Sequence, residues 1–173
     1  MAKLYFRYGA MNSGKSIEVL RTAHNYEEQG KRVLLLTPAI DDRYGVGSIT
    51  SRIGLSKEAV IVTEELDLYE LARERRPHCM LVDEAQFLNE AQVKALCAVV
   101  DELNIPVIAY GLRSDFLGRL FEGSYHLLAL ADQIEEVKAV CWRCQRKATM
   151  NMRMQGGVPV FEGRQIMIGG NES

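Results

Sequence analysis

Apolar runs recur along the chain, and segments with helical spacing separate them. Short continuous runs of this kind are typical of strands that are covered on both faces of a sheet. They lie at residues 3–8, 33–37, 59–62, 79–83 and 107–110. Strands that alternate with helices favour a parallel sheet with right-handed crossovers, so the pattern predicts an α/β fold.

The segments between these runs carry apolar residues spaced three and four apart, or end in helix-stop signals. We expect helices over residues 17–29, with Gly30 as the stop, and over 66–76, 90–103 and 123–131. Residues 41–57 show no strong period and are interpreted as a long polar loop. Long loops in compact domains are often functional or disordered.

From Val137 onward the pattern changes to short β-like pieces, interrupted by two cysteines and by Gly156-Gly157. We expect strands over residues 137–141, 147–154, 158–161 and 165–168. Pieces of this length with glycine between them are typical of hairpins. The sequence therefore predicts an α/β domain over residues 1–136 and a small β-rich appendage over residues 137–173.

Composition narrows the class of protein. The 173 residues fit one domain with a small appendage, and a hydrophobic content of 47% is enough for a buried core. The net charge of −2 gives no reason to expect a nucleic-acid partner. We find no run near the ~20 apolar residues of a membrane span and no signal-peptide pattern, and the four cysteines do not demand an oxidising compartment. We therefore expect a cytoplasmic protein without a membrane partner.

The stretch after the first strand carries the strongest chemical signal. Residues 9–16 read G-x-x-x-x-G-K-S, the phosphate-binding loop, between an aromatic strand and a helix. The glycines let backbone N–H groups point inward, and the helix adds the positive end of its dipole. Lys15 can reach the β- and γ-phosphates, and Ser16 can ligate Mg²⁺. The predicted ATP-binding residues are Gly9, Ala10, Met11, Asn12, Ser13, Gly14, Lys15 and Ser16, in a P-loop (RecA-like) domain.

Two carboxylates follow the apolar strand at residues 79–82. In P-loop enzymes an acid at this place holds Mg²⁺, so Asp83 is the candidate metal-side acid together with Ser16. Glu84 lies one residue further and is the candidate base for an attacking hydroxyl or water, a role worth typically ~10²–10⁴-fold in rate. A pair of acids alone also fits a solvated strand end, but the upstream phosphate loop favours the functional interpretation. Ala85 and Gln86 complete the expected ATP-side set.

Several classes share such a core. A GTPase needs an N-K-x-D stretch, which this sequence lacks. Asp83-Glu84-Ala85-Gln86 is similar to the box of helicase-like ATPases, but a second motor domain does not fit in 173 residues. A non-enzymatic zinc-ribbon protein would leave the phosphate loop unexplained. A small-molecule kinase fits best, with a nucleic-acid-stimulated ATPase as the alternative and a nucleotide-binding protein without turnover as the third hypothesis.

Six stretches, taken together and in order, resemble the cytosolic (type II) thymidine kinases. They are residues 9–16, 41–44, 83–87, 110–116, 141–144 and 168–172. The resemblance implies ATP- and Mg²⁺-dependent phosphorylation of the 5′-hydroxyl of thymidine, with deoxyuridine as a second acceptor, giving dTMP and ADP in nucleotide salvage. It also implies a homotetramer and feedback inhibition by thymidine triphosphate (dTTP).

The resemblance assigns roles to individual positions. Glu84 is the general base, and Leu112, Phe116 and Phe121 pack against thymine. The two phenylalanines also fit an ordinary core role. Arg43 and Arg52 belong to a loop near the phosphates, although solvated loop charges explain them equally well. The remaining residues expected at the nucleoside are Met11, Arg153, Gln165, Ile166, Met167, Ile168 and Gly169, the last five in a closing segment called a lasso.

Cys141 and Cys144 have the spacing of half a structural zinc site. Such sites are nearly always four-coordinate. In the family a second Cys/His pair follows the stretch that here ends at Ser173, and the three histidines lie far upstream. We expect that the sequence stops short of the natural C-terminus, and the alternative is that this version has lost its zinc. The fold expected for residues 137–173 is thus a zinc-ribbon-like lasso domain.

Overall fold

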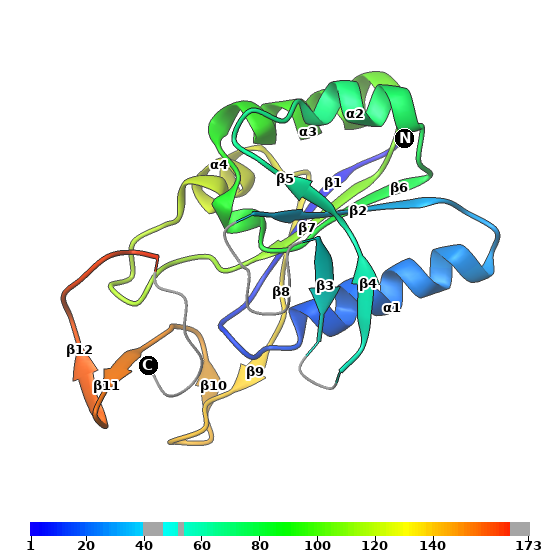
Figure 1. Ribbon diagram of the computed structural model, residues 1–173. Helices are drawn as coiled ribbons and strands as arrows, with labels where there is room; N and C mark the ends of the chain where they lie inside the picture. Colours follow the sequence, from blue (N-terminus) through cyan, green and yellow to red (C-terminus); the bar gives the residue numbers. More distant parts are fainter. Residues whose placement is uncertain (40–46, 52–53, 167–173) are drawn as a thin grey trace.

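A parallel β-sheet forms the centre of the computed structural model, which describes residues 1–39, 47–51 and 54–166 (Figure 1). Its strands are β1 (Leu4–Tyr8), β2 (Val33–Pro38), β5 (Val60–Val62), β6 (Cys79–Val82), β7 (Val107–Gly111) and β8 (Gln133–Glu136). Their order is β5-β2-β6-β7-β1-β8, and every pairing is parallel. Strand β7 lies between β1 and β6, and all three strands run in the same direction. The segments that follow β1 and β6 therefore leave the same edge of the sheet. The predicted α/β fold of the P-loop type is confirmed.

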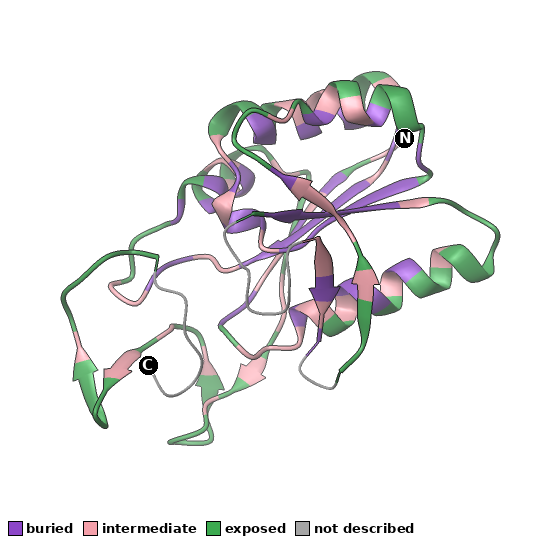
Figure 2. Cartoon of the chain, viewed as in Figure 1, coloured by how far each residue is buried: buried purple, intermediate pink, exposed green. Residues whose placement is uncertain are grey.

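Helices cover both faces of the sheet (Figure 1). Helix α1 (Lys15–Glu28) lies on one face, and α2 (Leu68–Arg75), α3 (Glu90–Leu103) and α4 (Glu122–Leu130) lie on the other. Successive strand residues point to opposite faces, which divides the core in two. Leu35 and Leu81 pack with α1, whereas Leu34 and Met80 pack with the other helices. The central strands β2, β6 and β7 are accordingly the most buried strands of the sheet (Figure 2).

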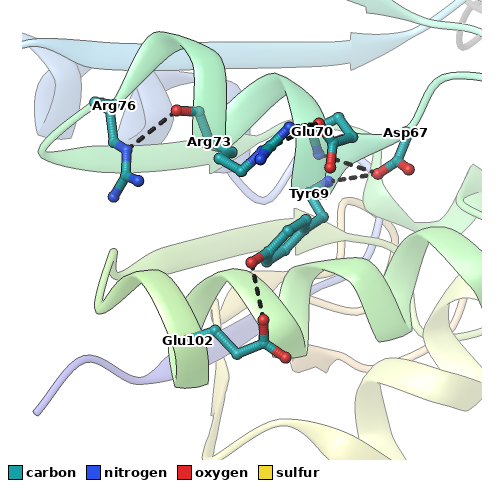
Figure 3. Close-up of polar contacts among 6 residues, drawn as sticks. All are labelled: Asp67, Tyr69, Glu70, Arg73, Arg76 and Glu102. Carbon is teal, nitrogen blue, oxygen red and sulfur yellow. Dashed lines mark hydrogen bonds and ion pairs between the residues drawn. The ribbon is translucent and has the colours of Figure 1, made fainter.

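Local polar contacts fix the outer layer where α2 passes α3 (Figure 3). The Asp67 carboxylate caps α2 by accepting from the backbone N–H groups of Tyr69 and Glu70 at 2.9 and 3.1 Å. The Tyr69 hydroxyl donates to Glu102 of α3 across 2.8 Å, and Arg73 pairs with Glu70 at 2.7 Å. These groups are exposed, so they set orientation more than they add stability.

Two features differ from the pattern-based expectation. Strand β8 was not predicted, because Gln133–Glu136 is polar and mostly exposed at the edge of the sheet, where one flank lacks a neighbouring strand. Part of the expected loop at residues 41–57 forms an antiparallel pair of short strands, β3 (Ser48–Thr50) and β4 (Ser56–Glu58). Strands of three residues are too short to show a period, although Ile49 is buried against α1.

The C-terminal part forms two antiparallel pairs. Strand β9 (Ala139–Val140) pairs with β10 (Lys147–Ala148), and β11 (Arg153–Gln155) pairs with β12 (Val158–Val160), which confirms the β-rich pattern. The single strand expected over residues 147–154 was wrong, because residues 149–152 form no strand and the two ends of that stretch belong to different pairs. The strand expected at 165–168 is not formed at Gln165 and Ile166, and its other two residues lie outside the described part. The boundary between residues 136 and 137 stays a prediction. Among the described helices, none is long and apolar enough to cross a membrane.

Candidate active site

The phosphate loop joins β1 to α1 and is shaped by two glycines. Gly14 precedes α1 with φ +84°, a left-handed backbone that glycine adopts without cost. A Cβ on Gly9 would lie 2.6 Å from the Ser13 hydroxyl and 2.7 Å from the Val137 carbonyl oxygen. The loop therefore closes tightly at Gly9, against the chain that enters the C-terminal part.

Lys15 lies folded inside this loop. Its Nζ donates to the carbonyl oxygens of Ala10 at 2.7 Å and Gly9 at 3.3 Å, and to the Ser13 hydroxyl at 3.0 Å. Burial lowers the pKa of Lys15 below its ordinary value, and the carboxylates of Glu84 and Asp83 act in the opposite direction. The loop thus carries a buried ammonium group that its own carbonyl dipoles and two nearby acids stabilise.

Asp83 ends the apolar strand β6 and faces the start of α1. The Ser16 hydroxyl donates to its Oδ2 across 2.9 Å, and the backbone N–H of Glu84 donates to its Oδ1 across 2.9 Å. Burial raises the pKa of Asp83 to about 7, and the carboxylate of Glu84 adds to this rise. A hydroxyl and a buried carboxylate side by side are ligands that Mg²⁺ prefers, so this pair fits the ion that the P-loop class uses.

Glu84 turns the chain out of the strand. Its backbone lies in the left-handed region with φ +52°, which is uncommon for a residue with a side chain and is found preferentially at functional sites. Its carboxylate Oε2 accepts a hydrogen bond from Gln86 Nε2 at 2.5 Å. Gln86 Oε1 in turn accepts from the backbone N–H of Leu112 at 3.1 Å. The candidate base is therefore linked to the loop that follows β7.

Three residues expected at the nucleoside come together next to that loop. The guanidinium of Arg153 lies 3.8 Å from the centre of the Phe116 ring, and its Nη2 donates to the Gln165 carbonyl oxygen at 3.5 Å. The Gln165 amide donates to the buried carboxylate of Asp115 at 3.2 Å. Phe121 is instead 5% exposed and contacts Phe87 edge-to-face, with ring centres 5.7 Å apart, so its side chain belongs mainly to the core.

Asn151 was not predicted from the sequence as a residue of the site. Its Oδ1 accepts from the backbone N–H of Met11 at 2.8 Å, and its Nδ2 donates to the Ser114 carbonyl oxygen at 3.2 Å. One side chain from the C-terminal part thus contacts both the phosphate loop and the loop after β7. A single asparagine between two methionines carries no pattern that would have marked it.

The remaining candidates are placed only in part. Leu112 is half-buried, Met11 and Ile166 are exposed on the same side as the loops above, and Ala85 is fully buried under α4. Five candidates lie outside the described residues, namely Arg43, Arg52, Met167, Ile168 and Gly169.

Cys141 and Cys144 lie in the tight turn between β9 and β10. The Cys141 N–H donates to the Arg146 carbonyl oxygen at 2.7 Å, and the Gln145 N–H donates to the Cys141 carbonyl oxygen at 3.0 Å. The backbone N–H groups of Cys144 and Arg143 lower the pKa of the Cys141 thiol, which favours the thiolate that zinc binds. In the part of the chain that is described, no group of three or more potential metal ligands occurs, so the expected zinc site stays a prediction for these two sulfurs.

Comparison with known proteins shows the family of this chain. The family model described as thymidine kinase matches residues 2–173. Thymidine kinase from Lactococcus lactis subsp. lactis (strain IL1403) is 57% identical over 175 aligned positions, which cover 100% of this chain and 93% of that protein. Thymidine kinases from Streptococcus pyogenes and Lactiplantibacillus plantarum are each 54% identical, with 93% and 91% of their lengths covered.

A solved structure of the Legionella pneumophila ATPase DotB is similar at a TM-score of 0.36 and 20% identity, covering 68% of this chain and 32% of that one. At this level the structural similarity carries no conclusion about function. The family match and the relatives suffice by themselves, because they extend over essentially the whole length. This chain belongs to the thymidine kinase family.

Proposed function

We propose that the site described above transfers the γ-phosphoryl group of ATP to the 5′-hydroxyl of thymidine, with Glu84 as the general base. As a member of the thymidine kinase family, the chain is a phosphotransferase that uses ATP. The observation that carries the proposal is the position of Glu84. On one side, burial lowers the pKa of Lys15 in the phosphate loop, and the charge of the Glu84 carboxylate opposes this shift. On the other side, the carboxylate is hydrogen-bonded to Gln86, which in turn is hydrogen-bonded to Leu112.

On the phosphate side, the loop N–H groups would receive the β-phosphate, and Lys15 would exchange its carbonyl partners for phosphate oxygens. Ser16 and Asp83 would hold Mg²⁺, which neutralises charge on the phosphates when it is bound. The lowered pKa of Lys15 and the raised pKa of Asp83 show that both groups lack full compensation for burial. A polyphosphate and a divalent cation would supply it.

In the reaction, Glu84 accepts the proton of the 5′-hydroxyl while that oxygen forms a bond to the γ-phosphorus. The bond between the γ-phosphorus and its bridging oxygen breaks, and the electron pair leaves with ADP. The products are dTMP, ADP and the proton on Glu84. A positioned base of this kind contributes typically ~10²–10⁴-fold, and most of the remaining catalysis comes from orientation and charge stabilisation.

On the acceptor side, the Arg153 guanidinium packs on the Phe116 ring, and this pair would form the aromatic wall for a pyrimidine. Leu112 and Met11 add apolar surface, and Gln165 and Ile166 lead toward the lasso residues. The same apolar and aromatic surfaces would accept deoxyuridine, which differs only by a methyl group. Binding through an apolar wall and a few directed polar groups is usual for small-molecule sites.

The proposal includes four further expectations of the family. Two ligands from beyond the described residues would complete a zinc site with Cys141 and Cys144. The chain would form a homotetramer, would be inhibited by thymidine triphosphate (dTTP), and would act in the cytoplasm. None of these enters the chemical step above.

The test uses Glu84→Gln, which keeps size and hydrogen bonding but cannot accept the proton. ADP formation from ATP and Mg²⁺ is measured with and without thymidine, and ATP binding is measured by calorimetry. We expect thymidine-dependent turnover in the parent protein, a fall in kcat of about 100-fold or more in the variant, and ATP affinity within about twofold. Unchanged kcat would remove Glu84 from the base role. ADP release that responds to DNA or RNA instead of thymidine would favour the ATPase alternative.

A further inference from the structure

We infer that Gln86 is a positioning residue, which fixes the carboxylate of Glu84 relative to the acceptor loop. The acceptor loop is the segment after β7 that begins at Leu112 and carries Asp115 and Phe116. This inference rests on the proposed role of Glu84 as base. The sequence pattern placed Gln86 on the ATP side, but its side chain makes its two hydrogen bonds to Glu84 and to Leu112. It therefore acts between the base and the nucleoside wall.

The nitrogen and the oxygen of the Gln86 side-chain amide bind different partners. The Nε2 group donates to Glu84 Oε2 at 2.5 Å, and the Oε1 atom accepts from the Leu112 N–H at 3.1 Å. An amide is rigid, so it fixes the separation of its donor and its acceptor. Gln86 is 1% exposed, so water does not compete for either bond. One carboxylate oxygen is thereby held, and we assign the other, Oε1, to the 5′-hydroxyl.

Two glycines enclose Gln86 from neighbouring elements. A Cβ on Gly111, at the end of β7, would lie 2.6 Å from Gln86 Oε1. A Cβ on Gly123, in the first turn of α4, would lie 2.3 Å from the Ala85 carbonyl oxygen and 2.9 Å from the Gln86 carbonyl. Neither glycine has a left-handed backbone, so both are required for space and not for conformation. The backbone of Gly111 therefore lies close against the amide oxygen of Gln86, and the backbone of Gly123 lies close against the main chain of Gln86.

The same contacts fix the far end of the link. The Ser124 hydroxyl, also in the first turn of α4, donates to the Leu112 carbonyl oxygen, so Leu112 is held through both its N–H and its C=O. Leu112 begins the loop that carries Asp115 and Phe116. A shift of the base relative to this loop by about 1 Å is enough to cost on the order of 10²-fold in rate. The effect should appear in kcat, because the link is to the base and not to the phosphate loop.

The test compares two buried glutamines. Gln92 in α3 is 5% exposed, and its amide donates to the Thr63 carbonyl oxygen at 2.7 Å, within a cap and remote from Glu84. We expect Gln86→Met and Gln92→Met to lower the melting temperature by similar amounts. Only Gln86→Met should lower kcat, by tenfold or more, with the KM for ATP within about twofold of the parent. A kcat within twofold of the parent for folded Gln86→Met would overturn the inference.

A double-mutant cycle separates positioning from packing. If Gln86 acts through Glu84, adding Gln86→Met to Glu84→Gln should change kcat by less than twofold, measured by single-turnover transfer of labelled phosphate. An equal loss in both backgrounds would show a packing role and overturn the inference. Glu84→Gln alone reports on the proposed function, so the two failures are distinguishable. If Gln86→Met does not fold, Gln86→Asn keeps a neutral amide but is one carbon shorter, so it cannot hold Glu84 and Leu112 at once and should reproduce the kcat loss.

Discussion

The backbone N–H of Met11 donates to the side chain of Asn151 across 2.8 Å, although 140 positions separate the two residues in sequence. Asn151 also donates to the Ser114 carbonyl oxygen at 3.2 Å. One asparagine therefore ties the C-terminal strands to the phosphate loop and to the acceptor loop at once. In the proposed reaction, these two loops hold the phosphate donor and the acceptor, so their relative position sets the distance between the two.

Replacing Asn151 with alanine should separate these loops. Two hydrogen bonds of about 0.5–1.5 kcal/mol each are lost, so kcat/KM for thymidine should fall about 5- to 150-fold, measured in steady-state assays with saturating ATP. Met152 is 62% exposed, and Met152→Ala is the matched control, expected within about twofold of the parent. Equal effects of the two substitutions would mean that Asn151 does not act as a link.

The pair of Phe116 and Arg153 should control acceptor binding. Arg153→Lys keeps the charge but loses the planar guanidinium that stacks on the ring at 3.8 Å. Such contacts are worth about 0.5–2 kcal/mol, so the KM for thymidine should rise about 2- to 30-fold while the KM for ATP stays unchanged. Arg164 is exposed, and Arg164→Lys serves as the control. A parallel rise in both KM values would contradict a role specific to the acceptor.

Gly123→Ala should destabilise the protein, although alanine normally stabilises a helix over glycine by about 1 kcal/mol. The added Cβ would lie 2.3 Å from a backbone carbonyl oxygen, which cannot move without shifting the acid-bearing segment. We expect a loss of about 1–3 kcal/mol in the free energy of unfolding, measured by urea denaturation. Leu130→Ala, at the exposed end of the same helix, should change it by less than about 0.5 kcal/mol. A more stable Gly123→Ala would show that the segment is loosely packed.

Stability should depend on pH through Asp83 when Mg²⁺ and nucleotide are omitted. Burial, together with Glu84, raises the pKa of this carboxyl from 3.8 to about 7 in the folded chain. Between these values the folded state binds more protons than the unfolded state, so the free energy of unfolding falls as the pH rises through this window. The lowered pKa of Lys15 has the opposite sign, with stability rising as the pH rises toward the ordinary lysine value.

The measurement is thermal unfolding between pH 5 and pH 7.5, with the matched variant Asp83→Asn. We expect the decline in melting temperature toward neutral pH to be absent in Asp83→Asn, and to be reduced in the parent protein by Mg²⁺ with ATP, which favour the ionised carboxyl. A decline of equal size in the variant would assign it to other groups.

The sequence by itself determined the α/β class and the nucleotide side of the site. Apolar runs at β2, β6 and β7 are buried on both faces, and strands of this kind can be recognised from their composition alone. Residues 9–16 are contiguous, and their glycine positions and Lys15 carry the phosphate-binding pattern within eight positions. Asp83 and Glu84 were predicted as site residues because they follow a buried strand directly.

Only the tertiary structure decided how the acceptor side is assembled. Phe116, Arg153 and Gln165 meet through chain segments that are distant in sequence, and Asn151 and the amide of Gln86 have no local signature. The exposed strand β8 escaped prediction for a related reason, since its place is set by pairing with β1 and not by an apolar pattern. Local patterns report burial and backbone conformation, whereas contacts between distant loops depend on how the whole sheet orders its strands.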